Sequence, residues 1–203
     1  MRYDTLPGDE IINRTVSALG ASGISVQVVA NKDEARVRVL SLLPQGSEVM
    51  TMSSETLNQT GIALMINESP DYVSVRKKLT GMKRETQGRE MQVKGAAPEC
   101  AVGSAQVVTE KGELIFASNT GSQLPAYAYG SDKVILVVGV QKIVANLETA
   151  MKRLYEYVLP LESERAHKAY GVAASNVSKI LIINKEVIPG RIQLILVKER
   201  LGF

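Results

Sequence analysis

Three short polar segments carry the residue types that hold small anions. They are the segments 53–56 (Ser-Ser-Glu-Thr), 118–122 (Ser-Asn-Thr-Gly-Ser) and 139–142 (Gly-Val-Gln-Lys). Backbone N–H groups at helix starts attract negative charge, glycine allows close approach, and a lysine adds a positive charge. The residues selected as ligand-binding are Ser53, Ser54, Thr56, Asn119, Thr120, Gly121, Ser122, Gly139 and Lys142. Each segment alone is also an ordinary connector, and only together do they predict a site for an anionic small molecule.

Glu110 is the one carboxylate that we select as a candidate catalytic residue. It stands at a predicted hairpin turn, two residues before Gly112, and next to the expected crevice. A carboxylate in that place can act as a nucleophile or as a base. A solvent-exposed turn acid is the plainer interpretation, and both interpretations stay open.

Cysteine and histidine offer little chemistry here. Cys100 is the single cysteine and His167 the single histidine, so the chain has no internal disulfide and no cysteine set for zinc or an iron–sulfur cluster. A thiol nucleophile needs a base and a histidine site needs partners, and the sequence places neither. We therefore expect no metal site. Neither the G-x-x-x-x-G-K-[ST] phosphate loop nor a G-x-G-x-x-G after the first predicted strand is present.

The composition is typical of a soluble globular protein. The chain has 203 residues, of which 45% are hydrophobic and 22% charged. A chain of this length can bury a stable core without a disulfide or a structural metal. The N-terminus lacks the apolar centre of a signal peptide, and the longest apolar run, 134–140, is too short to span a bilayer. We expect one domain over residues 1–203, with residues 1–8 as a tail, in the cytoplasm.

Positive charge is concentrated in one segment, 72–94, which holds seven basic and two acidic residues, whereas the whole chain carries +3. A solvated helical face explains this pattern, and so does a surface for an acidic partner or an anionic ligand. The absence of Trp and the aromatic content of 4% argue against nucleic-acid binding by base stacking.

Helices and strands are expected to alternate around the polar segments. Apolar spacing predicts helices over 9–19 and 31–43, and β-branched runs predict strands over 24–30, 48–52 and 133–140. This alternation implies a parallel sheet with helices on its faces, and ligands bind such sheets beyond the carboxyl ends of the strands.

The remaining elements are two predicted hairpins and a helix. Residues 104–117 form the first hairpin, and a long helix is expected to follow from about Val144. The strands 178–185 and 192–198, joined through a Pro-Gly turn, are expected to add a C-terminal β-hairpin to the sheet.

From about Ala18 to Phe203, the order and spacing of these motifs resemble the LUD-domain family, the lactate utilization proteins. The matching stretches read ALGASGISVQVVANKDEA, LLPQGSEVM, SSETLNQTGI, VGSAQVVTEKGELIFASNTGSQLP, VILVVGVQKIVANLETAMKRL and KILIINKEVIPGRIQLILVKERLGF. One departure is Lys111 between Glu110 and Gly112, where the family commonly has Thr.

The resemblance implies a three-layer α/β/α fold with a mostly parallel sheet, like that of glucosamine-phosphate isomerases, ribose-phosphate isomerases and coenzyme A transferases. It also implies a role in oxidising L-lactate to pyruvate beside partner proteins that carry iron–sulfur clusters, while this chain binds no cofactor of its own. By analogy with coenzyme A transferases, Glu110 would form a covalent intermediate, which is an argument from fold alone. A second hypothesis is an independent transferase, ligase or isomerase acting on a phosphorylated or coenzyme A substrate. A third is a binding module that uses segment 72–94.

Overall fold

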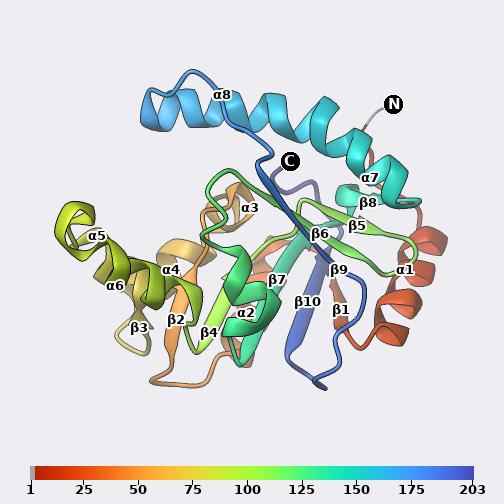
Figure 1. Cartoon of the computed structure of the whole chain (residues 1–203). Helices are drawn as coiled ribbons and strands as arrows, with labels where there is room; N and C mark the ends of the chain where they lie inside the picture. The colour runs from red at the N-terminus through yellow and green to blue at the C-terminus, as the bar shows by residue number, and fades with distance from the viewer. Residues whose placement is uncertain (1–2) are drawn as a thin grey trace.

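A six-stranded parallel sheet is the centre of the computed structural model, which describes residues 3–203 apart from the side chain of Tyr170 (Figure 1). All its neighbouring strands run parallel, in the spatial order β3, β2, β4, β7, β10, β1. Their bounds are β1 (Ser25–Val29), β2 (Glu48–Thr51), β3 (Val73–Ser74), β4 (Cys100–Gly103), β7 (Lys133–Gly139) and β10 (Ile192–Val197). The predicted parallel sheet is confirmed.

Burial on both faces sets the order of the strands. The middle strands β4, β7 and β10 are apolar along almost their whole length, and most of their side chains are buried. Strand β1, at one edge, carries the polar Gln27 and keeps much of its surface exposed. A strand without polar alternation is stable only where helices or another sheet cover both of its faces.

Helices lie on both faces of this sheet, as the sequence predicted, and give the α/β/α arrangement that the family resemblance implied. Their bounds are α1 (Asp9–Ala21), α2 (Lys32–Leu42), α3 (Glu55–Gln59), α4 (Ile62–Glu68), α5 (Val75–Thr80), α6 (Arg84–Ala96), α7 (Leu147–Arg153) and α8 (Leu159–Tyr170). Helices α2, α3 and α4 share one apolar core with the sheet, and α1 belongs to a second core that includes Val134, Leu136 and Val138 of β7.

A second sheet of four strands completes the second core. It has the order β8 (Ile143–Val144), β5 (Val107–Thr109), β6 (Leu114–Ser118), β9 (Lys179–Ile183). Strands β5 and β6 pair antiparallel, so the predicted hairpin is confirmed. The outer side of β5 and β6 packs against α7 and the π-helical turn Leu154–Val158 that joins it to α8. In Figure 1 this long helical element runs across the strand ends of the molecule.

The two C-terminal strands are present where predicted, but they do not form a hairpin with each other. Strand β9 pairs antiparallel with β6 in the small sheet, whereas β10 enters the large sheet between β1 and β7. The physical reason is burial. Strand β10 is buried along nearly all of its length and requires a central position, whereas the partly exposed β9 is suited to an edge.

The first residues of the chain contact the domain. Residues 1 and 2 of the expected tail 1–8 lie outside the described residues. The buried ring of Tyr3 packs 5.8 Å from the ring of Tyr157, centroid to centroid, and Asp4 accepts a hydrogen bond from Arg200 at 2.9 Å. The described part of the expected tail therefore contributes to packing.

Acidic neighbours neutralise part of the basic segment 72–94. Lys77 pairs with Glu68 at 2.8 Å, and Lys78 pairs with Glu48 at 3.1 Å. Arg76 turns toward the ends of the sheet strands, where it hydrogen-bonds the carbonyl of Thr51. Much of the charge that stood out in the sequence is thus engaged within the fold.

Candidate functional site

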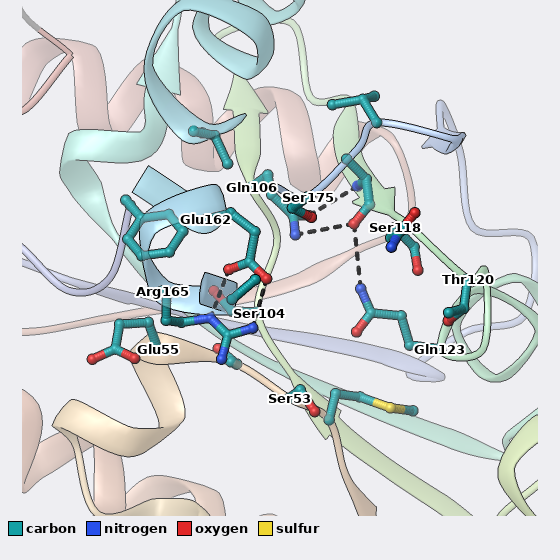
Figure 2. A pocket seen from close by; sticks show the side chains of 18 of the residues that line it. Ser53, Glu55, Ser104, Gln106, Ser118, Thr120, Gln123, Glu162, Arg165 and Ser175 are labelled. Atoms are coloured by element: carbon teal, nitrogen blue, oxygen red, sulfur yellow. Dashed lines mark hydrogen bonds and ion pairs between the residues drawn. The ribbon is translucent and has the colours of Figure 1, made fainter. Parts of the chain in front are cut away.

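A pocket of about 420 Å³ lies at the carboxyl ends of three adjacent strands, β2, β4 and β7. Its floor comes from the segments that follow these strands, and its walls come from the loop after β6, from α8 and from the segment 172–177. Figure 2 shows Ser53 and Glu55 on one side of the pocket and Thr120 and Gln123 on the other. This is the edge at which parallel α/β sheets bind ligands.

Lys142 is the most unusual residue of the pocket floor. Its side chain is almost fully buried, and its Nζ donates to Thr56 Oγ1 at 2.9 Å, to Ser104 Oγ at 3.3 Å and to the Ala105 carbonyl at 3.4 Å. None of these partners is a carboxylate, and Lys142 forms no ion pair with any residue of 3–203. A buried ammonium group without a counter-charge is costly, so an anion is favoured beside it.

Two effects lower the pKa of Lys142 to about 7. The larger is burial, which disfavours the charged ammonium form, and the second is the positive charge of Arg153. Arg153 is itself fully buried, donates from Nη1 to the Gln106 carbonyl at 2.7 Å, and lies over the ring of Tyr157. Burial also lowers the pKa of Arg153 to about 10. The basic groups of Lys142 and Arg153 thus lie close together at and beneath the pocket floor, and neither forms an ion pair with an acidic side chain of residues 3–203.

The segment after β2 contributes three of the predicted ligand residues. The hydroxyl of Ser54 caps helix α3 by accepting from the Leu57 N–H, and Thr56 is buried against Lys142. Ser53 Oγ accepts from Arg76 at 3.3 Å, which brings a guanidinium group into the same wall. The sequence predicted the hydroxyl groups here but not this arginine.

The segment after β6 forms the second predicted wall. Asn119, Thr120 and Ser122 line the pocket, whereas Gly121 does not. Gly121 has φ of +84°, and its N–H donates to Ser118 Oγ at 2.9 Å, so this glycine shapes the turn. Gly121 was predicted to bind the ligand, but in the structure it forms the turn that positions Thr120 and Ser122.

Gly139 also lies outside the pocket lining, although it precedes Lys142 by only three residues. A Cβ on Gly139 would overlap the side chain of Gln141 and the backbone of residues 199 and 201. Close packing of the strand end against the C-terminal segment therefore explains this glycine. Seven of the nine predicted ligand residues line the pocket. The other two, Gly121 and Gly139, lie outside the lining and are required by the turn and the packing next to it.

Glu110 lies away from the pocket. Its carboxylate forms an ion pair with Arg14 of helix α1, and its backbone N–H donates to the Val144 carbonyl at 2.8 Å. It is not among the residues that line the pocket. The hairpin turn that carries Glu110 points toward α1, because Gly112 packs against the C-terminal end of that helix. The expectation that Glu110 faces the crevice does not agree with this geometry.

Helix α8 supplies a wall that sequence reasoning missed. Glu162 and Arg165 form a two-pronged ion pair, with Arg165 Nε and Nη2 at 2.7 and 2.6 Å from the two carboxylate oxygens. Figure 2 shows the two side chains facing each other and joined by dashed lines, in the neighbourhood of Ser104. The pattern Glu-x-x-Arg is common on helix surfaces, so nothing local indicates that this one faces a pocket.

Ser104 and Gln106 are further lining residues that sequence reasoning missed. They directly follow β4, so the rule that selected the segments after β2 and β7 could have found them. Gln106 also bridges to β6, because its side chain donates to the Ala117 carbonyl and accepts from the Ala117 N–H.

Neither Cys100 nor His167 belongs to the pocket lining. Cys100 is buried in the core formed with α2, α3 and α4, and burial is the main cause that raises the pKa of its thiol. His167 is exposed, and its Nδ1 lies 2.9 Å from the Val172 carbonyl. Within residues 3–203, no three His, Cys, Asp or Glu side chains come together as a metal-binding group.

A family model described as the LUD domain matches residues 12–197, nearly the whole chain. The chain belongs to the LUD domain family. The LUD domain described here also resembles the crystal structure of a DUF162 family protein from Deinococcus radiodurans, with a TM-score of 0.58 and 15% sequence identity over 95% of this chain and 99% of that one. At this identity the likeness shows the fold alone. No curated protein matches the sequence.

Family membership relates this LUD domain to lactate utilization in general terms. Nearly the whole length of the Deinococcus protein is matched, so the likeness of fold extends over both chains. In the part of the chain that the structure describes, no helix is both long enough and apolar enough to cross a membrane.

Proposed function

We propose that this LUD domain binds a small organic anion in the pocket and serves as the cluster-free component of an assembly that oxidises L-lactate to pyruvate. The observation that carries the proposal is the buried Nζ of Lys142, which lines the pocket and has only hydroxyl and carbonyl partners. Family membership supplies the link to lactate.

The chemistry of a 2-hydroxy acid fits the pocket floor. The carboxylate of the ligand would be the counter-charge for the Lys142 ammonium group, which has none within residues 3–203. The hydroxyl groups of Thr56 and Ser104 would hydrogen-bond the hydroxyl or the second carboxylate oxygen of the ligand. A charge-assisted hydrogen bond of this kind contributes about 1.5–3 kcal/mol when it is desolvated. Binding would therefore depend on Lys142 more than on any rim residue.

Oxidation of L-lactate to pyruvate releases two electrons and two protons, and an acceptor must take the electrons. The residues of this chain do not fit an iron–sulfur cluster, because Cys100 is the single cysteine and is buried in an apolar core. Under the proposal, the electron acceptor belongs to partner proteins that carry iron–sulfur clusters. The role of this chain would be to bind and orient the organic acid.

Growth on L-lactate tests the assembly role. A strain that lacks this protein should lose L-lactate oxidation, and the wild-type chain should restore it. Lys142→Met should fail to restore it, whereas Lys133→Met should succeed, because Lys133 begins β7 at the opposite end of the sheet and donates to the Leu42 carbonyl. Unimpaired lactate oxidation in the deletion strain would reject the role.

The size of the pocket favours a second candidate, an independent transferase, ligase or isomerase. A volume of about 420 Å³ is more than a three-carbon acid fills and lies within the range of sites for larger ligands. Apolar side chains of the outer wall, including Val158, Leu159 and Val172, would suit the uncharged part of a phosphorylated or coenzyme A substrate.

Thermal-shift measurements separate the two candidates. Coenzyme A thioesters, sugar phosphates, folates and L-lactate are titrated against the full chain. A true ligand at 100 times its Kd stabilises the fold by about 2.7 kcal/mol. Stabilisation by one of the larger classes but not by L-lactate would favour the independent enzyme. Stabilisation by L-lactate alone would favour the lactate assembly.

A further inference from the structure

We propose that Lys142 is a nucleophilic amine that condenses with the carbonyl group of a 2-oxo acid bound in the pocket, giving an imine. The proposal rests on the anion-binding pocket of the proposed function and names a second class of ligand for it. It stands on the position of one amine: buried, at the floor of a pocket, and touched by three neutral oxygen atoms.

Other lysines of the chain are held differently. Lys77, Lys78 and Lys152 are exposed and pair with carboxylates outside the pocket. Lys133 donates to a backbone carbonyl away from the pocket. Lys142 is buried, lines the pocket and has no acidic partner among the described residues. These conditions favour a lysine amine that is neutral and nucleophilic near neutral pH.

The atoms of the reaction balance without a further reagent. The Nζ lone pair attacks the carbonyl carbon, and the carbonyl oxygen takes up a proton to give a carbinolamine. Loss of that oxygen as water then forms the C=N bond. These steps need proton transfers at the floor of the pocket, and the hydroxyl groups of Ser104 and Thr56, 3.3 and 2.9 Å from Nζ, are placed to relay them.

A 2-oxo acid fits this site better than a simple aldehyde or ketone. A protonated imine on Lys142 would keep a positive charge beside Arg153, whose Nε and Nη2 have no hydrogen-bond partner among the described residues. In a 2-oxo acid the carboxylate is bonded directly to the carbonyl carbon, so its negative charge lies next to the imine carbon. The ligand therefore brings its own counter-charge into a pocket floor that lacks one.

Reductive trapping of the full chain tests the proposal. The protein is incubated with pyruvate and cyanoborohydride, digested and mapped by mass spectrometry. We expect one reduced adduct on Lys142, at least about ten-fold above the adduct on Lys133, because Lys142 lines the pocket that would hold the 2-oxo acid and Lys133 does not. Lys142→Arg, which keeps a positive charge, should lose the adduct. No adduct on Lys142, or equal labelling of Lys142 and Lys133, would overturn the proposal.

L-Lactate has no carbonyl group that can form an imine, so it separates this proposal from the proposed function. Calorimetric binding of L-lactate without any trapped pyruvate would overturn the imine and leave the proposed function standing. A pyruvate adduct on Lys142 that excess L-lactate does not suppress would support the imine and count against lactate as the ligand. Suppression of the adduct by L-lactate would support both.

Discussion

Lys142 Nζ lies 2.9 Å from Thr56 Oγ1, and this contact joins the segment after β7 to helix α3, which follows β2. Strand β4 lies between β2 and β7 in the sheet, and Ser104, directly after β4, completes the cluster at 3.3 Å from both groups. Three strand ends that are distant in the sequence thus meet at one amine. This convergence makes Lys142 the residue on which the chemistry of the pocket depends.

The burial of Lys142 should make the stability of the fold depend on pH. The pKa of Lys142 is about 7 in the folded chain and 10.5 as an ordinary value. Between these values the unfolded chain binds a proton that the folded chain does not, so the free energy of unfolding rises with pH, by up to about 1.4 kcal/mol per pH unit from this group. The penalty is fully present below about pH 7 and vanishes above the unfolded pKa.

Lys142→Met removes this dependence and is expected to stabilise the chain more at about pH 7 than at about pH 9. Urea denaturation of both proteins across this range measures the difference. A gap between the two free energies of unfolding that narrows as pH rises is the expected result. Parallel curves would show that Lys142 does not lose its proton in the folded state.

Glu162 should weaken anion binding, because its carboxylate places a negative charge in the wall of the pocket. Its side chain and that of Arg165 are about one-third and one-quarter exposed, so water screens part of the effect. Glu162→Gln is expected to tighten the binding of an organic anion by about two- to five-fold. Glu164→Gln makes the same charge change on the exposed side of α8 and should have less effect. Equal changes in affinity from both variants would indicate only a general charge effect.

Glu110→Gln should leave ligand binding unchanged. The carboxylate of Glu110 pairs with Arg14, lies outside the pocket lining, and is held on the side of the hairpin that faces α1. The affinity of the full chain for any ligand of the pocket, measured by titration calorimetry, should match that of the wild type. A large loss of affinity or of turnover would restore Glu110 as a candidate for the chemistry.

Gly103 is required by the packing beneath the pocket. A Cβ on Gly103 would overlap the hydroxyl and ring of Tyr127, which is buried and packs 4.6 Å from the ring of Phe116, centroid to centroid. Gly103→Ala is expected to destabilise the fold by at least about 1–3 kcal/mol, as overpacking does. Gly20 in helix α1 has nothing within 4 Å of an added Cβ, so Gly20→Ala should stabilise by about 0.5–1 kcal/mol. Denaturation of the two variants gives the comparison, and similar losses in both would contradict it.

Much of the fold and part of the pocket follow from the sequence. Apolar runs and the turns between them predicted the parallel sheet, the helices on its faces and the hairpin of β5 and β6, and the family resemblance implied the three layers. The strand-end rule then selected Ser53, Thr56 and Lys142, which meet in one pocket. These results were predictable because local periodicity and the topology of parallel sheets leave few alternatives.

The remaining features depend on contacts between distant segments. Ile143 and Val144 pair with β5 as a short strand, and helix α7 begins only after the cap at Asn146, whereas the apolar spacing alone predicted a helix from about Val144. No local pattern in the sequence predicts that β9 pairs with β6, or that α8 lies over the strand ends. Glu110 looked catalytic because the sequence gives the position of its turn but not the direction in which the turn points.

Calorimetric titration of the full chain with L-lactate tests the central role of Lys142 most directly. At about pH 8, above the pKa of Lys142, binding should take up protons from the buffer, because a bound carboxylate raises the pKa of a buried lysine. Lys142→Met should abolish this proton uptake and weaken binding by at least about ten-fold. Binding with unchanged affinity in Lys142→Met, or without proton uptake in the wild type, would contradict the assignment of Lys142 as the anion-binding residue.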